Sequence, residues 1–259
     1  MSLSSSHHGK HSNAYVGEPW PILVVSLPSD SERRSRIGSQ LRDLSLPFTF
    51  VDAIDGRTGL SQDNFALVDQ DGARKNIGRA LTSPEIGCAL SHLKVYRLIL
   101  DQGLEGAIVL EDDAVLLPDF RTFIDCRGYL EAPLLQLEYA GTRVFPGRGR
   151  SALPHYRTAR VATQSHLTVA YSINAFAARH LLEVALPLSG PADWPCDTIK
   201  VGHKVLIPKL VRHPEGNDDQ SHIAASRNLA RAQGESRGGF LTEGYWRMWW
   251  RKLLSVRIA

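Results

Sequence analysis

The pattern of apolar and polar positions along the chain predicts alternating strands and helices, as in an α/β protein. Continuous runs rich in Val, Ile and Leu predict buried strands at 21–27, 47–54, 107–110, 134–139, 166–173 and 205–211. Apolar residues spaced by three or four predict helices at 31–44, 60–68, 82–102, 118–130 and 174–186. Between these elements, 69–80 is expected to form a mobile loop, and 141–160 a loop or hairpin.

Capping signals mark the starts of two of these helices. Ser31 follows a Pro-Ser-Asp break and is expected to cap the first helix. Thr82 is followed by Pro84 and, three residues on, by Glu85, which is the pattern of a capping box. Gly103 is the expected stop of this second helix.

Length and composition bound the class of protein. A chain of 259 residues can form one large α/β domain or two small ones. A formal net charge of only +3 argues against a nucleic-acid-binding protein. The three cysteines, Cys88, Cys126 and Cys196, are not closely spaced, so we expect reduced thiols in a cytoplasmic setting. No stretch approaches the roughly 20 apolar residues of a membrane span.

The composition shifts twice, which predicts three segments. Residues 1–18 are rich in Ser and His, lack the apolar core of a signal peptide and are expected to be disordered. Residues 19–224 contain all the predicted strands and form the globular domain. Residues 225–259 form a basic, Trp-rich helical tail. Such a helix suits an anionic membrane surface, and the alternative is that its indoles pack on the domain.

Three adjacent carboxylates, Glu111, Asp112 and Asp113, follow the apolar run at 107–110. Open α/β sheets bind their ligands at the carboxyl ends of strands. Neighbouring carboxylates repel one another, and Mg²⁺ or Mn²⁺ would compensate them because these ions prefer oxygen ligands. In an extended chain Glu111 and Asp113 point the same way. The alternative interpretation is a solvated acidic turn.

Cations and histidines lie near several strand ends. Arg33 and Arg34 fall in the first turns of the first helix, where backbone N–H groups and guanidinium groups together suit a phosphate. A solvated helix face is the alternative for part of this cluster. His92 interrupts an apolar helix and can equally be a hydrogen-bonded interior histidine. His213 follows the last strand.

The turn at 191–197 carries two carboxylates, Asp193 and Asp197, and one indole, Trp194. A carboxylate in such a position can act as a general base, and an indole can stack on a sugar ring. The alternative for both aspartates is turn capping, since Asp is a common turn residue.

Four strings in the chain resemble those of glycosyltransferase family 25, the lipopolysaccharide galactosyltransferase-like enzymes, whose domain also occurs in collagen galactosyltransferases. The strings are Val24–Leu27 with Arg33-Arg34, Phe50–Gly56, Glu85–Leu93 and Ile108–Asp113. The resemblance covers roughly residues 20–224. Ser26 departs from it, because the family usually has Asn at the end of the first strand, and this bears on how the nucleotide base is held.

The resemblance implies a GT-A fold, a Rossmann-like α/β/α sandwich with a mainly parallel mixed central sheet. It implies inverting transfer of a hexose, usually galactose from UDP-galactose, to a lipooligosaccharide or other glycan acceptor, with Mn²⁺ or Mg²⁺ as cofactor. The expected metal ligands are Glu111, Asp113 and His213. Asp193 is the expected general base, with Asp197 in reserve. The expected substrate-binding residues are Arg33, Arg34, Asp52, Glu85, Ser91, His92, Asp112 and Trp194.

Two other functions are weighed against this one. A catalytically inactive relative would bind a nucleotide sugar or glycan without transferring it, and the intact acidic trio argues against that. A metal-dependent phosphohydrolase would use the same carboxylates without an acceptor, but the chain lacks a second His/Asp metal cluster. The expected location is the cytoplasm, with peripheral contact at the inner face of the membrane.

Overall fold

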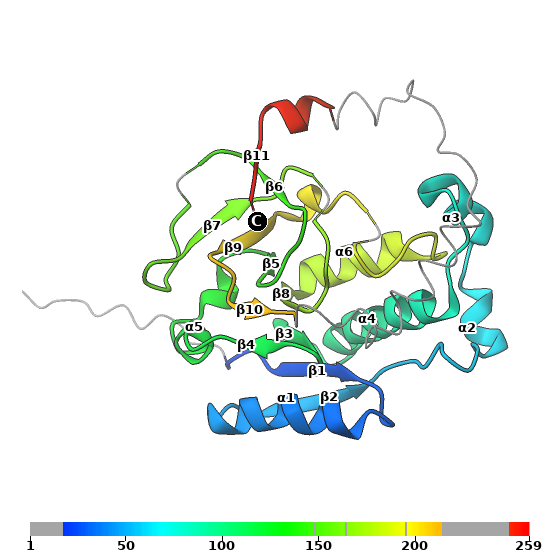
Figure 1. Ribbon diagram of the computed structural model, residues 1–259, viewed down its shortest axis with the longest axis horizontal. Helices are drawn as coiled ribbons and strands as arrows, with labels where there is room; N and C mark the ends of the chain where they lie inside the picture. Colours follow the sequence, from blue (N-terminus) through cyan, green and yellow to red (C-terminus); the bar gives the residue numbers. More distant parts are fainter. Residues whose placement is uncertain (1–17, 148, 164, 195, 214–248, 259) are drawn as a thin grey trace, which may run out of the picture.

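The computed structural model of the chain describes residues 18–147, 149–163, 165–194, 196–213 and 249–258 (Figure 1). The expected N-terminal tail, apart from residue 18, therefore lies outside the described residues. The predicted boundary at residue 224 lies outside them as well. The main sheet has seven strands in the order β2-β1-β3-β8-β5-β9-β7. Their bounds are β1 Ile22–Ser26, β2 Phe48–Asp52, β3 Gly106–Glu111, β5 Leu134–Gln136, β7 Arg157–Arg160, β8 Ala170–Asn174 and β9 His203–Ile207.

The sheet is mixed and mainly parallel, which confirms the predicted fold class. Strands β1, β2 and β3 are parallel neighbours, and β5 pairs in parallel with β9. Only β8 and the edge strand β7 run against their neighbours. Two short pairs complete the architecture, β4 (Val115–Leu116) with β10 (Val211–Arg212) and β6 (Arg143–Val144) with β11 (Val256–Arg257).

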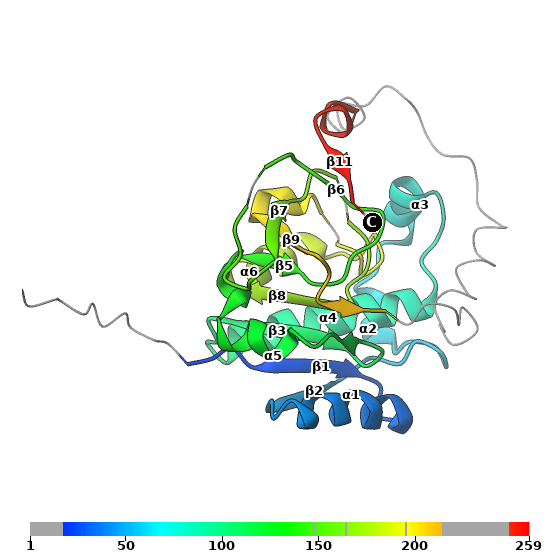
Figure 2. The same ribbon diagram turned by 60° about the vertical axis from the view of Figure 1, so that its left-hand side comes forward.

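Helices cover both faces of the sheet (Figure 2). Their bounds are α1 Ser31–Asp43, α2 Gln62–Ala66, α3 Gln70–Ile77, α4 Ser83–Asp101, α5 Phe120–Asp125, η1 Gly128–Leu130, α6 Ala175–Ala185 and η2 Thr198–Val201. Side chains of β3 alternate between the two layers: Ala107 and Val109 pack with α4 and α6, whereas Ile108 and Leu110 pack with α1 and α5. This alternation is the period of two expected of a strand that is buried on both faces.

The segment expected to be a mobile loop at 69–80 is instead helical, as α3. The Asp69 carboxylate accepts a hydrogen bond from the Gly72 N–H, and Gly78 ends the helix in the left-handed conformation. Both are ordinary helix signals, an N-cap and a C′ glycine, that the scattered charges of this stretch obscure. The prediction of a loop was wrong because a single buried side chain, Ala73, anchors this helix.

Other boundaries also differ from the prediction. The helix expected at 118–130 breaks into α5 and η1, because Arg127 adopts a left-handed backbone with φ of 55°. The first helix is capped from Asp30, whose side chain makes no capping hydrogen bond, so the expected role of Ser31 is wrong. The last predicted strand ends at Ile207, and Pro208 follows in a cis peptide before β10 begins.

The described part of the C-terminal segment lies against the domain. Residues 249–253 are helical, and β11 then adds to β6 (Figure 1). The Arg143 guanidinium donates to the carbonyls of Lys252 and Ser255, and Ile258 N–H donates to Thr142. Backbone pairing therefore anchors the end of this segment.

Candidate active site

The polar site is built where the sheet changes its order of strands. The chain crosses from β1 to β2 on one side of β1 and then returns to place β3 on the other side. Such a switch point leaves a crevice at the carboxyl ends of the strands, where α/β proteins bind ligands. Ser26, Asp52 and Glu111 end β1, β2 and β3, so parallel pairing brings all three to this edge.

Asp112 is held between the first strand and the first helix. The Ser26 hydroxyl donates to Asp112 Oδ2 over 2.6 Å, and Arg33 Nη1 donates to Oδ1 over 3.1 Å. Burial raises the pKa of Asp112, while the hydrogen bond from Ser26 and the charge of Arg33 oppose that rise. The residue that departs from the family pattern, Ser26, thus orients an acidic side chain in this protein.

Asp113 meets one guanidinium and one imidazole side chain. Arg33 Nη1 lies 3.6 Å from Asp113 Oδ2, and His213 Nε2 lies 3.4 Å from the same oxygen. Pairing of β4 with β10 explains the approach of His213, because Arg212 is the partner of Val115 in this ribbon. The contact with Asp113 raises the pKa of His213, against the opposite effect of burial.

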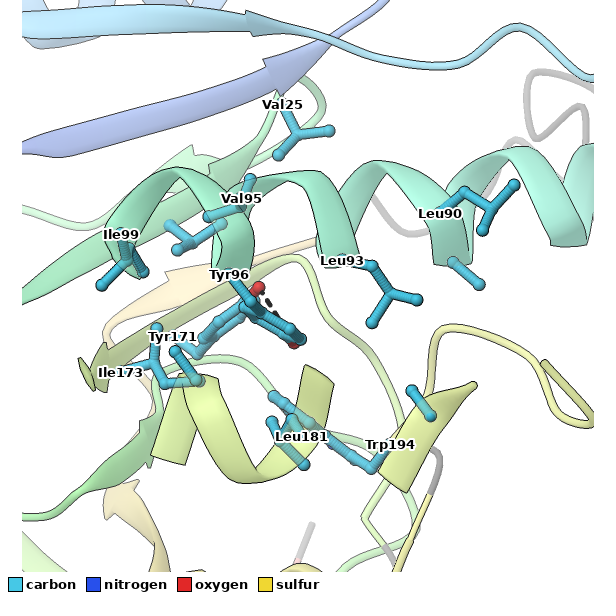
Figure 3. Packing of buried hydrophobic residues seen from close by; sticks show 14 of the residues in the cluster. Val25, Leu90, Leu93, Val95, Tyr96, Ile99, Tyr171, Ile173, Leu181 and Trp194 are labelled. Atoms are coloured by element: carbon cyan, nitrogen blue, oxygen red, sulfur yellow. Dashed lines mark hydrogen bonds between the residues drawn. The ribbon is translucent and has the colours of Figure 1, made fainter. Parts of the chain in front are cut away.

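Glu111 points toward helix α4 and the loop before β8. The Thr168 hydroxyl donates to Glu111 Oε1 over 2.7 Å, and His92 Nε2 lies 3.1 Å from the same oxygen. The other ring nitrogen of His92, Nδ1, lies 2.8 Å from the Tyr171 hydroxyl. Tyr171 donates to Tyr96, a bond drawn as a dashed line in Figure 3. His92 is therefore a buried, hydrogen-bonded histidine that also contacts the acidic trio.

Arg34 joins the ends of β1 and β2. Its guanidinium donates to the carbonyls of Ser26 and Leu27 and forms an ion pair with Asp52. It also lies over the Phe50 ring, 4.8 Å from the ring centroid. Arg34 and Asp52 thus shape the loop after β1, and Asp52 itself remains largely exposed.

Glu85 and Ser91 hold the frame of the site. Glu85 completes the predicted capping box with Thr82 and accepts two hydrogen bonds from Arg79. Burial works to raise the pKa of Glu85, but the bonds from Arg79 and Thr82 outweigh it and hold that pKa below its usual value. The Ser91 hydroxyl accepts from the Ile54 N–H, which fixes the loop after β2 on helix α4.

A glycine in α4 allows this loop to approach. A Cβ at Gly87 would lie 2.6 Å from the Ile54 carbonyl oxygen, so no larger side chain fits there. The strings around Gly56 and Gly87 therefore belong together in space, although they are far apart in sequence.

Asp193 is joined to the acidic trio through two consecutive loop residues. Asp193 Oδ1 accepts from the Leu167 N–H over 3.1 Å, and the next residue, Thr168, donates to Glu111. Leu167 has a φ of 75° and Trp194 a φ of 62°, conformations that are costly for non-glycine residues. Strained backbone at Trp194, which follows Asp193, and at Leu167, which donates to it, indicates that the position of Asp193 is specified by the surrounding structure.

The two other predicted residues of this turn have mainly structural surroundings. Trp194 is 2% exposed and packs against Tyr171 and His203 with ring centroids 5.2 Å apart in each case. Figure 3 shows Trp194 and Tyr171 within the buried apolar cluster. Its indole offers no open face, so this burial does not support stacking on an acceptor sugar. Asp197 Oδ1 caps η2 at Ile199, and Asp197 Oδ2 accepts from Arg251 over 2.9 Å.

The acidic trio has the chemistry of a site for a hard divalent cation. Asp113 Oδ1 is buried and has no hydrogen-bond partner within the described part of the chain. Carboxylate oxygens are the ligands that Mg²⁺ and Mn²⁺ prefer, and Arg33 and His213 show that this position attracts positive charge. Asp113, with Glu111 or Asp112, therefore fits such an ion.

Several residues of this site escaped the sequence analysis. Ser26 was seen only as a departure from a family pattern, and Thr168 was placed inside a strand that in fact begins at Ala170. Cys88, whose sulfur lies within 4.8 Å of His92 and Glu111 ligand atoms, and Tyr171, which contacts His92, look like ordinary core residues in the sequence. Only the position of Cys88 one helical turn before His92 was a readable signal.

Fold and site together define an α/β protein with an oxygen-rich crevice at a switch point, suited to a divalent cation and an anionic ligand. Residues 20–198 match the family described as glycosyltransferase family 25 (LPS biosynthesis protein). The match covers well over half of the chain, so the chain belongs to this family, as the resemblance indicated.

Relatives within the family differ in their described activity. The chain is 30% identical over 179 residues to the lacto-N-neotetraose biosynthesis glycosyltransferase LgtE of Neisseria meningitidis, covering 66% of this chain and 62% of LgtE. It is 32% identical over 175 residues to procollagen galactosyltransferase 1-B of Xenopus laevis, covering 62% of this chain and 28% of that protein. It is 31% identical over 170 residues to a probable inactive family member 3 of Rattus norvegicus, covering 62% and 29%.

The match spans less than a third of these two vertebrate proteins and 62% of LgtE. Among solved structures, a putative glucose-1-phosphate thymidylyltransferase from Bacillus anthracis overlaps 85% of this chain and 98% of its own chain, with a TM-score of 0.37 and 7% identity. Among the helices that the structure describes, none has the length and apolar character to cross a membrane.

Proposed function

We propose that this protein is an inverting, divalent-metal-dependent hexosyltransferase that moves galactose from UDP-galactose to a lipooligosaccharide or other glycan acceptor. The observation that carries the proposal is the cluster of Glu111, Asp112 and Asp113 at the switch point, where one buried oxygen of Asp113 has no hydrogen-bond partner among the residues that the structure describes. Family membership and the names of LgtE and the procollagen galactosyltransferase support the reaction class.

The cation would be held by Asp113 with Glu111 or Asp112, and His213 stands beside Asp113 as a further ligand. When bound there, Mn²⁺ or Mg²⁺ would screen the charge that develops on the diphosphate leaving group. Arg33 already bridges Asp112 and Asp113, so its guanidinium is placed to contact a phosphate oxygen once the cation takes over part of the carboxylate charge.

Asp193 is proposed as the general base. In an inverting transfer the acceptor oxygen forms a bond to the anomeric carbon while the bond to the diphosphate oxygen breaks. Asp193 would accept the proton of the acceptor hydroxyl, and the electron pair of the breaking bond would leave with the diphosphate. The loop through Leu167 and Thr168 keeps Asp193 in a fixed relation to Glu111.

The C-terminal segment is proposed to hold the enzyme on an anionic membrane surface, near a lipid-linked acceptor. Within 249–256 the large apolar side chains are exposed, with Trp250 at 58% and Leu254 at 62%, whereas Ile258 packs partly against the domain. Lys252 and Arg257 alternate with them, which matches the chemistry of acidic phospholipid headgroups.

The test of the transferase is a screen of UDP- and GDP-sugars for binding and hydrolysis in the presence and absence of Mn²⁺. We expect Mn²⁺-dependent binding of UDP-galactose and its slow hydrolysis without acceptor. Binding without hydrolysis or transfer would favour an inactive, sugar-binding family member instead. Rapid release of phosphate without an acceptor would favour a phosphohydrolase.

The test of membrane attachment compares the full chain with the double substitution Trp249→Ala and Trp250→Ala on vesicles of acidic phospholipid. We expect at least a tenfold loss of binding. Phe176→Ala is the matched control, because Phe176 is equally exposed, at 62%, on α6. Equal loss in the control, or binding that is the same on neutral vesicles, would contradict the proposal.

A further inference from the structure

A thiol, an imidazole and a carboxylate converge beside the acidic trio. Cys88 and His92 are one turn apart on α4, so their side chains share one face of the helix. Glu111 reaches them from the end of β3. One ligand atom from each, the Cys88 sulfur, a His92 ring nitrogen and a Glu111 carboxylate oxygen, lie within 4.8 Å of one another.

We propose that Cys88, His92 and Glu111 form a binding site for Zn²⁺ beside the Asp113 site for a hard cation, in which Asp112 rather than Glu111 then assists Asp113. Thiolate, imidazole and carboxylate are the three ligand types that Zn²⁺ takes, in tetrahedral geometry with a fourth position free for water or a ligand. Mg²⁺ and Mn²⁺ have little affinity for thiolate, so the sulfur separates the two sites by metal preference.

The geometry requires little rearrangement. His92 Nε2 and Glu111 Oε1 are already 3.1 Å apart, close to the separation of two ligands that each lie about 2 Å from a tetrahedral ion. Cys88 and Glu111 are half-buried rather than sealed in the core, so an ion can reach them. The buried member of the set, His92, is the one whose orientation is fixed by the protein.

Tyr171 supplies that orientation. Its hydroxyl lies 2.8 Å from His92 Nδ1 and is itself bonded to Tyr96. With the metal on Nε2, the ring would carry its proton on Nδ1, and this N–H would donate a hydrogen bond to the Tyr171 hydroxyl. Metal-bound histidines are commonly oriented by such a second partner. The Tyr171 hydroxyl donates its own hydrogen to Tyr96, so its oxygen can accept the hydrogen bond from His92 (Figure 3).

Binding must release a proton. Burial, and then the neighbouring charge of Glu111, raise the pKa of the Cys88 thiol well above its usual value. Cys88 is therefore a protonated thiol without a cation, and the S–H proton passes to solvent as the metal–sulfur bond forms. The site does not depend on the proposed transferase activity, because it needs neither nucleotide nor acceptor.

The experiment is a Co²⁺ titration of the full chain, since Co²⁺ replaces Zn²⁺ and reports a bound thiolate by a sulfur-to-cobalt charge-transfer band. We expect the band in the unmodified protein, its loss in Cys88→Ser, and its removal by excess Zn²⁺. The other two cysteines offer matched controls, so Cys126→Ser and Cys196→Ser should keep the band. The histidines of the N-terminal stretch cannot produce it, because they carry no sulfur.

Two further variants keep the test decisive if Cys88→Ser fails to fold. Glu111→Gln should weaken Co²⁺ binding at least tenfold while the charge-transfer band persists at saturation. Tyr171→Phe should weaken it roughly ten- to a hundredfold, the usual effect of removing a partner of a metal-bound histidine. Absence of the band in the folded, unmodified protein, or its survival in Cys88→Ser, would overturn the proposal. The Mn²⁺-dependent binding of UDP is a separate readout, so either proposal can fail alone.

Discussion

The carboxylates that end β3 and the carboxylates of the turn at 193–197 share a residue type but differ in what surrounds them. Asp112 and Asp113 are held by the Arg33 guanidinium and, for Asp113, the His213 imidazole, side chains that a metal ion can replace or join. Asp197 is satisfied by the backbone of η2 and by Arg251, a pattern of capping. Both groups have an arginine partner, so what separates them is the second carboxylate oxygen: Asp197 Oδ1 accepts from the backbone of η2, whereas Asp113 Oδ1 is buried and has no hydrogen-bond partner among the described residues.

Asp193 shares features with both the carboxylates that end β3 and the capping Asp197. It accepts one backbone hydrogen bond from Leu167, as a turn residue does, yet the loop that supplies this bond also contacts Glu111. Substitution of Asp193 and of its neighbours separates a role at the strand end from a role in the turn.

Removing the charge of Asp113 should have the largest effect. We expect Asp113→Asn to lower transfer about a thousandfold, because one electrostatic contact to developing charge contributes roughly 10²–10³ to the rate and the cation is lost as well. Mn²⁺-dependent UDP binding measured by calorimetry should disappear. Asp125→Asn, at a surface ion pair with Arg121, is the control and should keep full binding.

The general-base role can be assigned by substituting Asp193 and Asp197 separately. Asp193→Asn should lower kcat by about 10²–10⁴, the usual contribution of a general base, with little change in UDP binding. Asp197→Asn should change kcat less than threefold. Near-normal transfer by Asp193→Asn would place this residue with the structural turn, and a large loss in Asp197→Asn alone would exchange the two roles.

The buried His203, which packs on Trp194 of the turn, should make the free energy of unfolding depend on pH. Its ring is 1% exposed and contacts Trp194 and Thr198, and burial lowers the pKa of His203 from 6.5 to about 3. The unfolded chain therefore binds a proton below pH 6.5 that the folded protein does not. This contribution to stability is fully present above pH 6.5 and is lost as the pH falls toward 3.

Between pH 6.5 and about pH 5 the loss from His203 should be about 2 kcal/mol, at about 1.4 kcal/mol for each pH unit. Urea unfolding of the unmodified protein and of His203→Gln at both pH values measures it. The substitution should flatten the acid dependence by this amount, whatever it does to stability at neutral pH. An unchanged slope would show that His203 is not held neutral by its surroundings.

The smallest effect is expected at Arg251. Its ion pair with Asp197 is partly exposed to solvent on both sides, and such pairs contribute about 0–1 kcal/mol. Arg251→Gln should lower the melting temperature by no more than about 2–4 °C. Transfer should stay within twofold, and a loss near that of Asp193→Asn would mean that the C-terminal segment positions catalytic groups.

Much of the fold could be predicted because its signals are local. The buried strands at 22–26 and 106–111 and the capping box at Thr82 follow from apolar runs and from two side chains close in sequence. Helix α3 was missed because its core contacts are one buried alanine, Ala73, and the partly buried Ile77, too few to give an apolar period. The break at Arg127 was missed because nothing in the sequence marks a left-handed arginine.

The sequence predicted the main charged residues of the site, but not the hydrogen bonds that join them to other elements. A run of three acids after a strand is readable, and so is a pair of arginines at a helix start. The contacts of Ser26 with Asp112 and of Thr168 with Glu111 join residues 86 and 57 positions apart, and only the folded sheet brings them together. The burial of Trp194 could not be predicted either, because a tryptophan next to an aspartate in a turn is compatible both with sugar stacking and with packing in the core.

Asp113 and its neighbours are proposed to bind a divalent cation together with a nucleoside diphosphate. The most direct measurement is a crystal structure of the protein with Mn²⁺ and UDP, with anomalous diffraction used to locate the manganese. We predict one strong anomalous peak in direct coordination with Asp113 and a diphosphate oxygen, with Arg33 turned toward the phosphate. Well-ordered UDP without such a peak, or carboxylates still bound only by Arg33 and His213, would contradict it.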